Sequence, residues 1–190
     1  MGAVVGRRTA VTTVSALAGA VLAVSGCDAT TGGSAAPATT TNAVATEALW
    51  DPCTQISDDV LRQAGVDPST RDNTISGVEN VEGWKLCSWH DRAVRWNYAL
   101  GVWATTHSIE ETKQDQNNID FADVMAASRL GVRFKRAEDS HEEICYLSFP
   151  ANGQSIEISI YKTVLTEDER DPCDIALSAA QVLVPVFPAN

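Results

Sequence analysis

The chain has 190 residues, a hydrophobic fraction of 44% and a formal net charge of -11 at pH 7. This length accommodates one domain and a leader, and the hydrophobic fraction is ordinary for a globular protein. An acidic protein is repelled by nucleic acid, so we expect no nucleic-acid partner.

The start of the chain has the layout of an export signal. Arg7 and Arg8 form a basic segment, Thr9 to Val24 is mostly small and apolar, and small residues precede Cys27. The apolar run is shorter than the ~20 residues of a membrane-spanning helix. We therefore predict a signal peptide over residues 1–26. The two arginines are compatible with either general or twin-arginine export.

The residues Val24-Ser25-Gly26-Cys27 resemble a bacterial lipobox. The resemblance implies cleavage before Cys27 and attachment of diacylglycerol to its thiol, and several acyl chains hold a protein firmly on a bilayer. We therefore expect a protein anchored by Cys27 to the extracytoplasmic face of the cell membrane. Ordinary secretion with a spare thiol is the alternative.

Residues 27–48 are rich in Thr, Ala, Gly and Ser and contain almost no large apolar side chain. Such a segment cannot form a core, so we predict a flexible stalk that carries a single folded domain over residues 49–190. A random coil of ~20 residues spans about 25 Å. The threonines at 39–41 are candidates for O-linked sugar, and a bare spacer is the alternative.

The triplet Asp-Pro-Cys occurs twice, at residues 51–53 and 171–173. Asp is a preferred helix N-cap, and Pro is favoured at the first helical position. Each triplet therefore predicts a helix with a thiol in its first turn. Apolar residues at helical spacing follow the first triplet up to Gly65, and the second helix is predicted to end at Pro185.

Alternation of apolar and polar residues predicts the strands. The clearest pattern lies in residues 94–105, where Trp96, Tyr98, Leu100 and Val102 are expected to face the core. The other predicted strands are 84–90, 132–135, 143–149 and 155–162, with turns at 91–92 and 151–153.

Two helical segments are expected between the strands. Ser108-Ile109-Glu110-Glu111 is a capping box, and its helix is expected to end near Asn117. Residues 119–130 are interpreted as a second helical stretch. This order predicts an α+β fold, an antiparallel sheet of four to five strands with helices packed on one face.

Four cysteines remain besides Cys27, and in an exported chain they predict two disulfides. Three pairings are possible. Cys53–Cys87 with Cys145–Cys173 is favoured, because each pair then joins a helix start to the inner face of a nearby strand. The pairing of Cys53 with Cys173 is the alternative.

The order of these motifs resembles a known family. Asp-Pro-Cys, Cys87-Ser88-Trp89, Cys145 and Asp-Pro-Cys-Asp-Ile-Ala at 171–176 are similar to actinobacterial lipoproteins described as domain of unknown function 3558. The resemblance covers about Trp50 to Phe187. It implies an envelope-anchored domain with disulfides, and it supplies no catalytic residues.

The sequence contains no catalytic or metal-binding motif. His90, His107 and His141 are not at ligand spacing, and no nucleophile motif or phosphate-binding glycine loop is present. We therefore predict no metal, no cofactor and no enzyme activity.

Trp84 and Trp103 have no obvious place in the core. Exposed aromatic side chains stack on sugars or contact lipids and proteins, so these two are candidate contacts for an unknown envelope ligand or protein. Core packing is the alternative. We expect a non-catalytic binding or accessory module, and the alternative is an envelope hydrolase with a carboxylate acid/base pair. A hydrolase is expected to show a cleft with converging carboxylates, and a binding module an apolar groove or a flat patch.

Overall fold

The computed structural model describes residues 45–74, 77–79 and 81–190. The predicted signal peptide, Cys27 and residues 28–44 of the predicted stalk lie outside the described residues. Residues 46 and 47 contact the domain, since the backbone N–H of Gly83 donates to Thr46 Oγ1 at 2.7 Å and Lys85 Nζ donates to the carbonyl of Glu47 at 2.8 Å.

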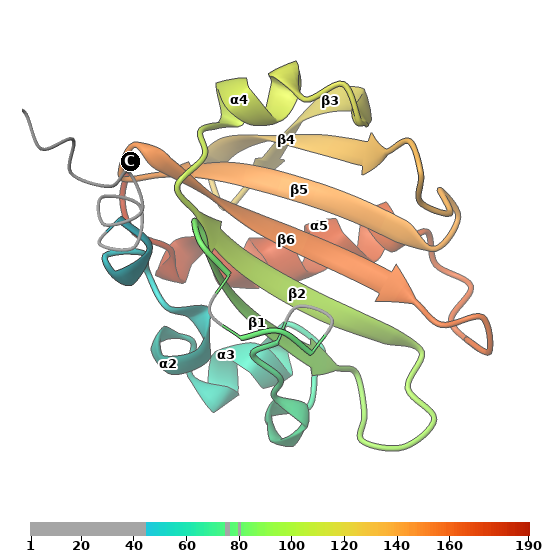
Figure 1. The fold of residues 1–190 in the computed structure, drawn as a ribbon. Helices are drawn as coiled ribbons and strands as arrows, with labels where there is room; N and C mark the ends of the chain where they lie inside the picture. Colours follow the sequence, from blue (N-terminus) through green and yellow to red (C-terminus); the bar gives the residue numbers. More distant parts are fainter. Residues whose placement is uncertain (1–44, 75–76, 80) are drawn as a thin grey trace, which may run out of the picture. The chain divides into compact units, whose positions relative to one another are not determined.

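The centre of the domain is an antiparallel sheet of six strands in the order β1-β2-β6-β5-β4-β3 (Figure 1). The prediction of an α+β fold with an antiparallel sheet is confirmed, and the predicted number of four to five strands is too low. The strands are β1 (Trp84–His90), β2 (Tyr98–Thr105), β3 (Asn118–Ala126), β4 (Arg129–Arg136), β5 (Ile144–Ala151) and β6 (Gln154–Lys162).

The helices begin where the sequence places their caps. The carboxylate of Asp51 accepts from the N–H of Cys53 at 2.9 Å, and that of Asp171 accepts from the N–H of Cys173 at 2.7 Å. The capping box at Ser108 is also present. The helices are α2 (Pro52–Gln55), α3 (Asp58–Gln63), α4 (Ile109–Gln114) and α5 (Pro172–Leu183), with the 3-10 turns η1 (Pro68–Thr70) and η2 (Val184–Val186).

One face of the sheet forms the main core with α5, which lies behind β5 and β6 in Figure 1. On β6 the core residues are Ile156, Ile158 and Ile160, each at most 2% exposed. The structure contains the disulfides Cys53–Cys87 and Cys145–Cys173, the pairing that the sequence favours. Each bridge ties the first turn of α2 or α5 to the core face of β1 or β5.

The predicted helix over residues 119–130 is wrong. This segment forms β3 and the start of β4, joined by a turn in which Ala127 and Ser128 have φ of 47° and 66°. β3 is an edge strand with a register shift between Ile119 and Ala122, and its outward side chains include the exposed Met125. The sequence of β3 has apolar residues on both faces of the strand, so apolar and polar residues do not alternate. Its alanines favour a helical interpretation.

Several predicted bounds also differ. The helix after the first Asp-Pro-Cys is divided in two, because the side chain of Ser57 accepts from Val60 N and caps α3 as a new helix. The helix α4 ends at Gln114 rather than near Asn117. Trp96 precedes β2 instead of lining the core, and it stacks on His90 with a centroid distance of 4.3 Å.

The expectation that helices pack on one face of the sheet is wrong for α4. Its buried Thr112 lies near Glu157, which points away from α5. Within the described part of the chain, no helix combines the length and the apolar character needed to cross a bilayer.

Candidate functional site

The face of the sheet opposite α5, here called the open face, carries an unusual set of buried polar residues. On β6, Ser155, Glu157 and Ser159 alternate with the core isoleucines and point to the open face. Their exposure is 1%, 3% and 9%. A strand face that is both polar and buried differs from an ordinary solvated face, because burying polar groups is unfavourable unless they are paired. The open face is therefore a candidate functional surface.

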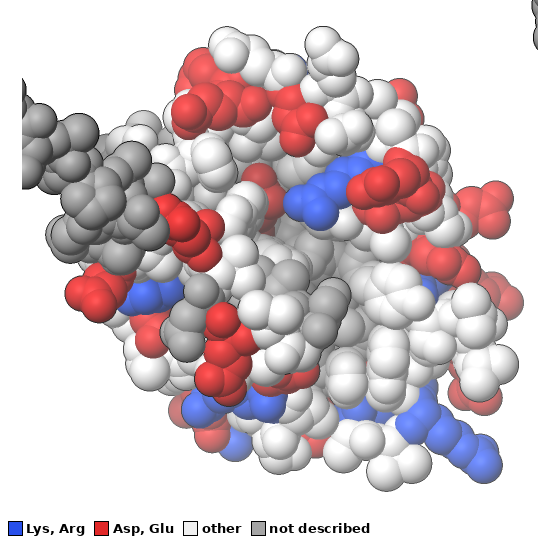
Figure 2. Space-filling model, viewed as in Figure 1, with Lys and Arg blue, Asp and Glu red and all other residues white. Residues whose placement is uncertain are grey.

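A cleft of about 460 Å³ is formed where α4 approaches the open face. Its volume lies within the ~300–1,000 Å³ range of small-molecule sites. Figure 2 shows this side of the domain, which is hollowed near its centre, with acidic and basic side chains at the hollow. The open-face cleft is lined by Trp84, His107, Glu111, Thr112, Asp115, Asn117, Asn118, Arg136, Glu138 and Glu157.

Glu157 lies at the floor of this cleft, and its side chain is only 4% exposed. Its Oε2 is 3.9 Å from Nη2 of Arg136, which is too long for a direct hydrogen bond. Burial raises the pKa of Glu157 to about 7, although Arg136 opposes this effect. Glu157 is therefore a carboxyl group that changes its charge near neutral pH.

Arg136 is held beside Glu157 by an aromatic ring. Its guanidinium carbon lies 4.4 Å from the ring centroid of Tyr146 on β5. The hydroxyl of Tyr146 donates to Asp139 Oδ2 at 2.7 Å, and burial raises the pKa of Tyr146. The ring and its hydrogen bond fix the one Lys or Arg side chain among the described residues that line the cleft.

Ser148 on β5 is directly opposite Glu157 in the sheet register. It is 0% exposed, and within the described residues its Oγ has no hydrogen-bond partner. Side chains at opposite positions lie about 5 Å apart at Cβ, so this hydroxyl lies beside Glu157, although it does not itself line the cleft. The open face therefore buries a hydroxyl group whose hydrogen-bonding capacity the described residues do not use.

Trp84 and Trp103, the two tryptophans singled out from the sequence, lie together on the open face. Their rings meet edge to face with a centroid distance of 6.2 Å, and Trp84 is also 5.8 Å from the ring of His107. The indole N–H of Trp103 donates to Ser159 Oγ at 2.9 Å. Both rings are half-buried, and Trp84 forms part of the cleft wall.

Gly101 makes room for this arrangement. A Cβ at this position would lie 2.5 Å from Ser159 Oγ and 2.6 Å from Trp103 Nε1. Only glycine therefore allows the indole of Trp103 to lie along the sheet surface beside Ser159.

Two carboxylates of the cleft have opposite environments. Glu111 accepts from the backbone N–H of Ser108 at 2.7 Å and from its hydroxyl at 3.0 Å, and these bonds lower its pKa. Burial raises the pKa of Glu157 instead. Such a contrast is the arrangement that acid/base pairs in hydrolases use.

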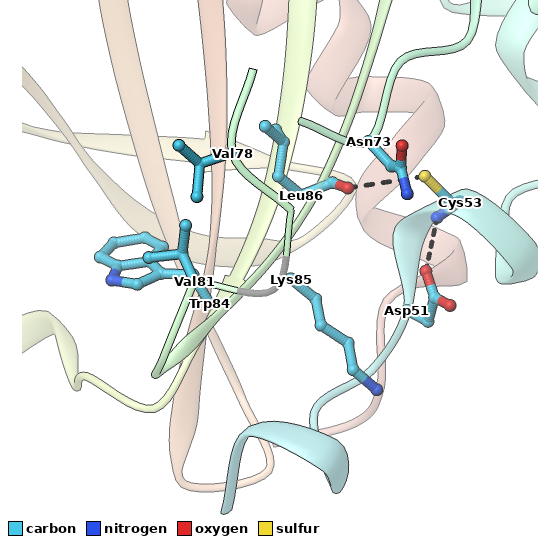
Figure 3. Close-up of a pocket in the computed structure, with 8 residues that line it drawn as sticks. All are labelled: Asp51, Cys53, Asn73, Val78, Val81, Trp84, Lys85 and Leu86. Carbon is cyan, nitrogen blue, oxygen red and sulfur yellow. Dashed lines mark hydrogen bonds between the residues drawn. The ribbon is translucent and has the colours of Figure 1, made fainter. Parts of the chain in front are cut away.

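A second, smaller cavity of about 160 Å³ lies beside the Cys53–Cys87 disulfide. Figure 3 shows Trp84 and Val81 on one side of it and Asp51 with Cys53 on the other. Its two charged side chains already serve the fold. Asp51 caps α2, and Lys85 Nζ donates to the carbonyls of Glu47 and Leu49 at 2.8 and 2.9 Å. We therefore assign it a structural role and take the open-face cleft as the candidate site.

The structure separates the three histidines. His107 lines the cleft, His90 stacks on Trp96, and His141 lies within 3.1 Å of the carbonyl of Arg136 through Nε2. Over the residues that the structure describes, no group of three or more His, Cys, Asp or Glu side chains is placed to hold a metal ion.

A family model described as "Protein of unknown function (DUF3558)" matches residues 22–186. The chain belongs to the DUF3558 family. The comparisons with curated proteins and with solved structures gave no match.

In this DUF3558 domain, sequence reasoning missed Glu157 and Arg136. Glu157 lies in the pattern Ile-Glu-Ile-Ser-Ile, where a charged residue between core isoleucines is read as facing solvent. No local signal shows that α4, Trp103 and Tyr146 cover it. Gly101 was the one available clue to the cleft, because a glycine inside a strand often marks a close approach.

Proposed function

We propose that this DUF3558 protein is a lipid-anchored, extracytoplasmic module that binds a ligand in the open-face cleft. The observation that carries the binding role is a cleft with an aromatic wall, formed by Trp84, and a floor of buried polar groups that includes Glu157. Ligand sites combine apolar walls with a few placed polar groups in this way. The anchor and the location are supported by Val24-Ser25-Gly26-Cys27 alone.

Binding is tested with the purified full-length chain by ligand-observed NMR against a panel of cationic, neutral and anionic small molecules. We expect at least one class to bind, and Trp84→Ala to weaken that binding about tenfold through loss of the aromatic wall. Trp50→Ala is the matched control, because Trp50 packs edge to face on Phe187 away from the cleft, with centroids 5.4 Å apart. Equal weakening by both variants, or no binding by any class, would contradict the proposal.

The anchor is tested separately by labelling cells with radioactive palmitate. The wild-type chain should incorporate label and sediment with membranes, and Cys27→Ala should do neither. Label in the Cys27→Ala chain would remove the anchor from the proposal.

A hydrolase is the second candidate, favoured by the contrasting environments of Glu157 and Glu111. In that case Glu157 would act as the general acid, because a carboxyl group with a raised pKa holds its proton near neutral pH. Turnover of a wall or lipid fragment that is lost in both Glu157→Gln and Glu111→Gln would support this candidate. Binding of the fragment without turnover would instead support the binding module.

A further inference from the structure

We infer that the open-face cleft accepts a small organic cation, whose ammonium group pairs with Glu157 and whose apolar body lies against Trp84. This inference rests on the proposed binding function and names the class of ligand.

The charges around the cleft favour a cation. Four acidic side chains line it, and Arg136 is the one Lys or Arg among its described lining residues. Figure 2 shows that acidic side chains predominate around the hollow. A cleft with an excess of one sign concentrates ligands of the opposite sign and excludes anions. The acids are Glu111, Asp115, Glu138 and Glu157.

Within the described residues, Glu157 is only partly paired. Arg136 is 3.9 Å away and is also engaged by the ring of Tyr146. The hydroxyl of Thr112 lies close enough to lower the pKa of Glu157, and it also donates to the carbonyl of Ser108 at 3.2 Å. A buried carboxylate with few donors is unfavourable, and an ammonium group would supply several N–H donors at this position.

Ser148 is a further buried polar group beside Glu157, although it does not itself line the cleft. Its buried Oγ has no partner in the described part of the domain and lies next to Glu157 across the strands.

Trp84 supplies the apolar wall. Its half-buried indole faces the cleft beside His107. Aromatic faces attract cations and pack against apolar groups. An amine that carries a ring can therefore pack against Trp84 and pair with Glu157 at the same time. The volume of about 460 Å³ holds a small molecule of this kind.

The test compares three probes of similar shape, namely benzylamine, benzyl alcohol and benzoate, by saturation-transfer NMR with the full-length chain at pH 8. Benzylamine should bind about tenfold more tightly than benzyl alcohol, because hydrogen bonds to charged groups contribute about 1.5–3 kcal/mol. Benzoate should bind most weakly. Glu157→Gln should remove the preference for the amine.

Glu110→Gln is the matched control, because Glu110 lies on α4, carries the same charge and lines a different groove. It should leave the preference unchanged. The groups that surround Glu157 are Arg136 from β4, Tyr146 from β5 and Glu111 from α4, with His107 at the rim. These groups are present in both the wild type and Glu157→Gln, so comparing the two proteins at each pH isolates the effect of Glu157 on binding. Amine binding to the wild-type chain should weaken by about tenfold from pH 8 to pH 6, as Glu157 takes up a proton.

Thermal unfolding under non-reducing conditions confirms that Glu157→Gln is folded, and Trp84→Leu is a second variant that should weaken benzylamine binding. Equal binding of benzylamine and benzyl alcohol, or an unchanged preference in Glu157→Gln, would overturn the ammonium assignment alone. Failure of all three probes to bind would overturn the small-ligand function as well.

Discussion

Replacing Glu157 with glutamine should stabilise the protein at high pH. The carboxyl group has a pKa of about 7 in the folded protein, against an ordinary value of 4.5, because it is buried on the open face. The folded state therefore binds its proton more tightly than the unfolded state does. Between pH 4.5 and about 7 the folded state holds more protons, so the free energy of unfolding falls as the pH rises.

The size of this effect follows from the two pKa values. A tenfold difference in proton affinity corresponds to about 1.4 kcal/mol, so ionising Glu157 should destabilise the folded protein by about 3 kcal/mol. Glutamine has nearly the same shape and no charge. The stability difference between Glu157→Gln and the wild type should therefore move by about 3 kcal/mol in favour of the variant from pH 4 to pH 8.

Urea unfolding measures this difference, with both disulfides kept intact by non-reducing conditions. Glu110→Gln is the control, since it removes the same charge at an exposed position of α4. A constant difference for Glu157→Gln, or one that moves against the variant, would refute the description of Glu157 as a buried and poorly paired carboxyl group.

Three further predictions concern the fold. Replacing both Cys145 and Cys173 with serine removes a disulfide of sequence separation 28. The free energy of unfolding, measured in urea, should fall by about 3–4 kcal/mol. A loss well below this would mean that the unfolded chain is already constrained. Asp171→Ala removes the cap of α5 and should cost about 1 kcal/mol in thermal unfolding, and an unchanged Tm would refute the role of the cap. Gly101→Ala should displace Trp103 and destabilise the protein by about 1–3 kcal/mol, with a change in tryptophan emission; an unchanged spectrum would contradict the close approach.

The parts of the fold that depend on local chemistry could be predicted from the sequence. Asp51 and Asp171 cap their helices, the box at Ser108 caps α4, and Asn152-Gly153 forms the hairpin between β5 and β6 with φ of 49° and 75°. In each case one or two side chains decide the local conformation. The isoleucines of β6 also face the core as their alternation predicts.

The parts that depend on tertiary contacts could not be predicted. In the described sheet β3 is an edge strand beside β4 and exposes apolar side chains such as Met125, so its sequence has no clear alternation. Trp96 fits the apolar phase of β2, but it stacks on His90 before the strand begins. Glu157 is a candidate site residue because α4 and Tyr146 bury it, and both are distant from it in the sequence. A pattern along one strand cannot show what covers its outer face.

Adjacent residues of β6 have different roles because they point to opposite faces of the sheet. Ile156, Ile158 and Ile160 hold the strand to α5, while Ser155, Glu157 and Ser159 furnish the opposite surface. Because neighbouring positions point in opposite directions, substitutions on the open face of β6 need not disturb the core that the two disulfides cross-link. The same scaffold is thus suited to redesign, in which new specificities are introduced at alternate positions of a single strand.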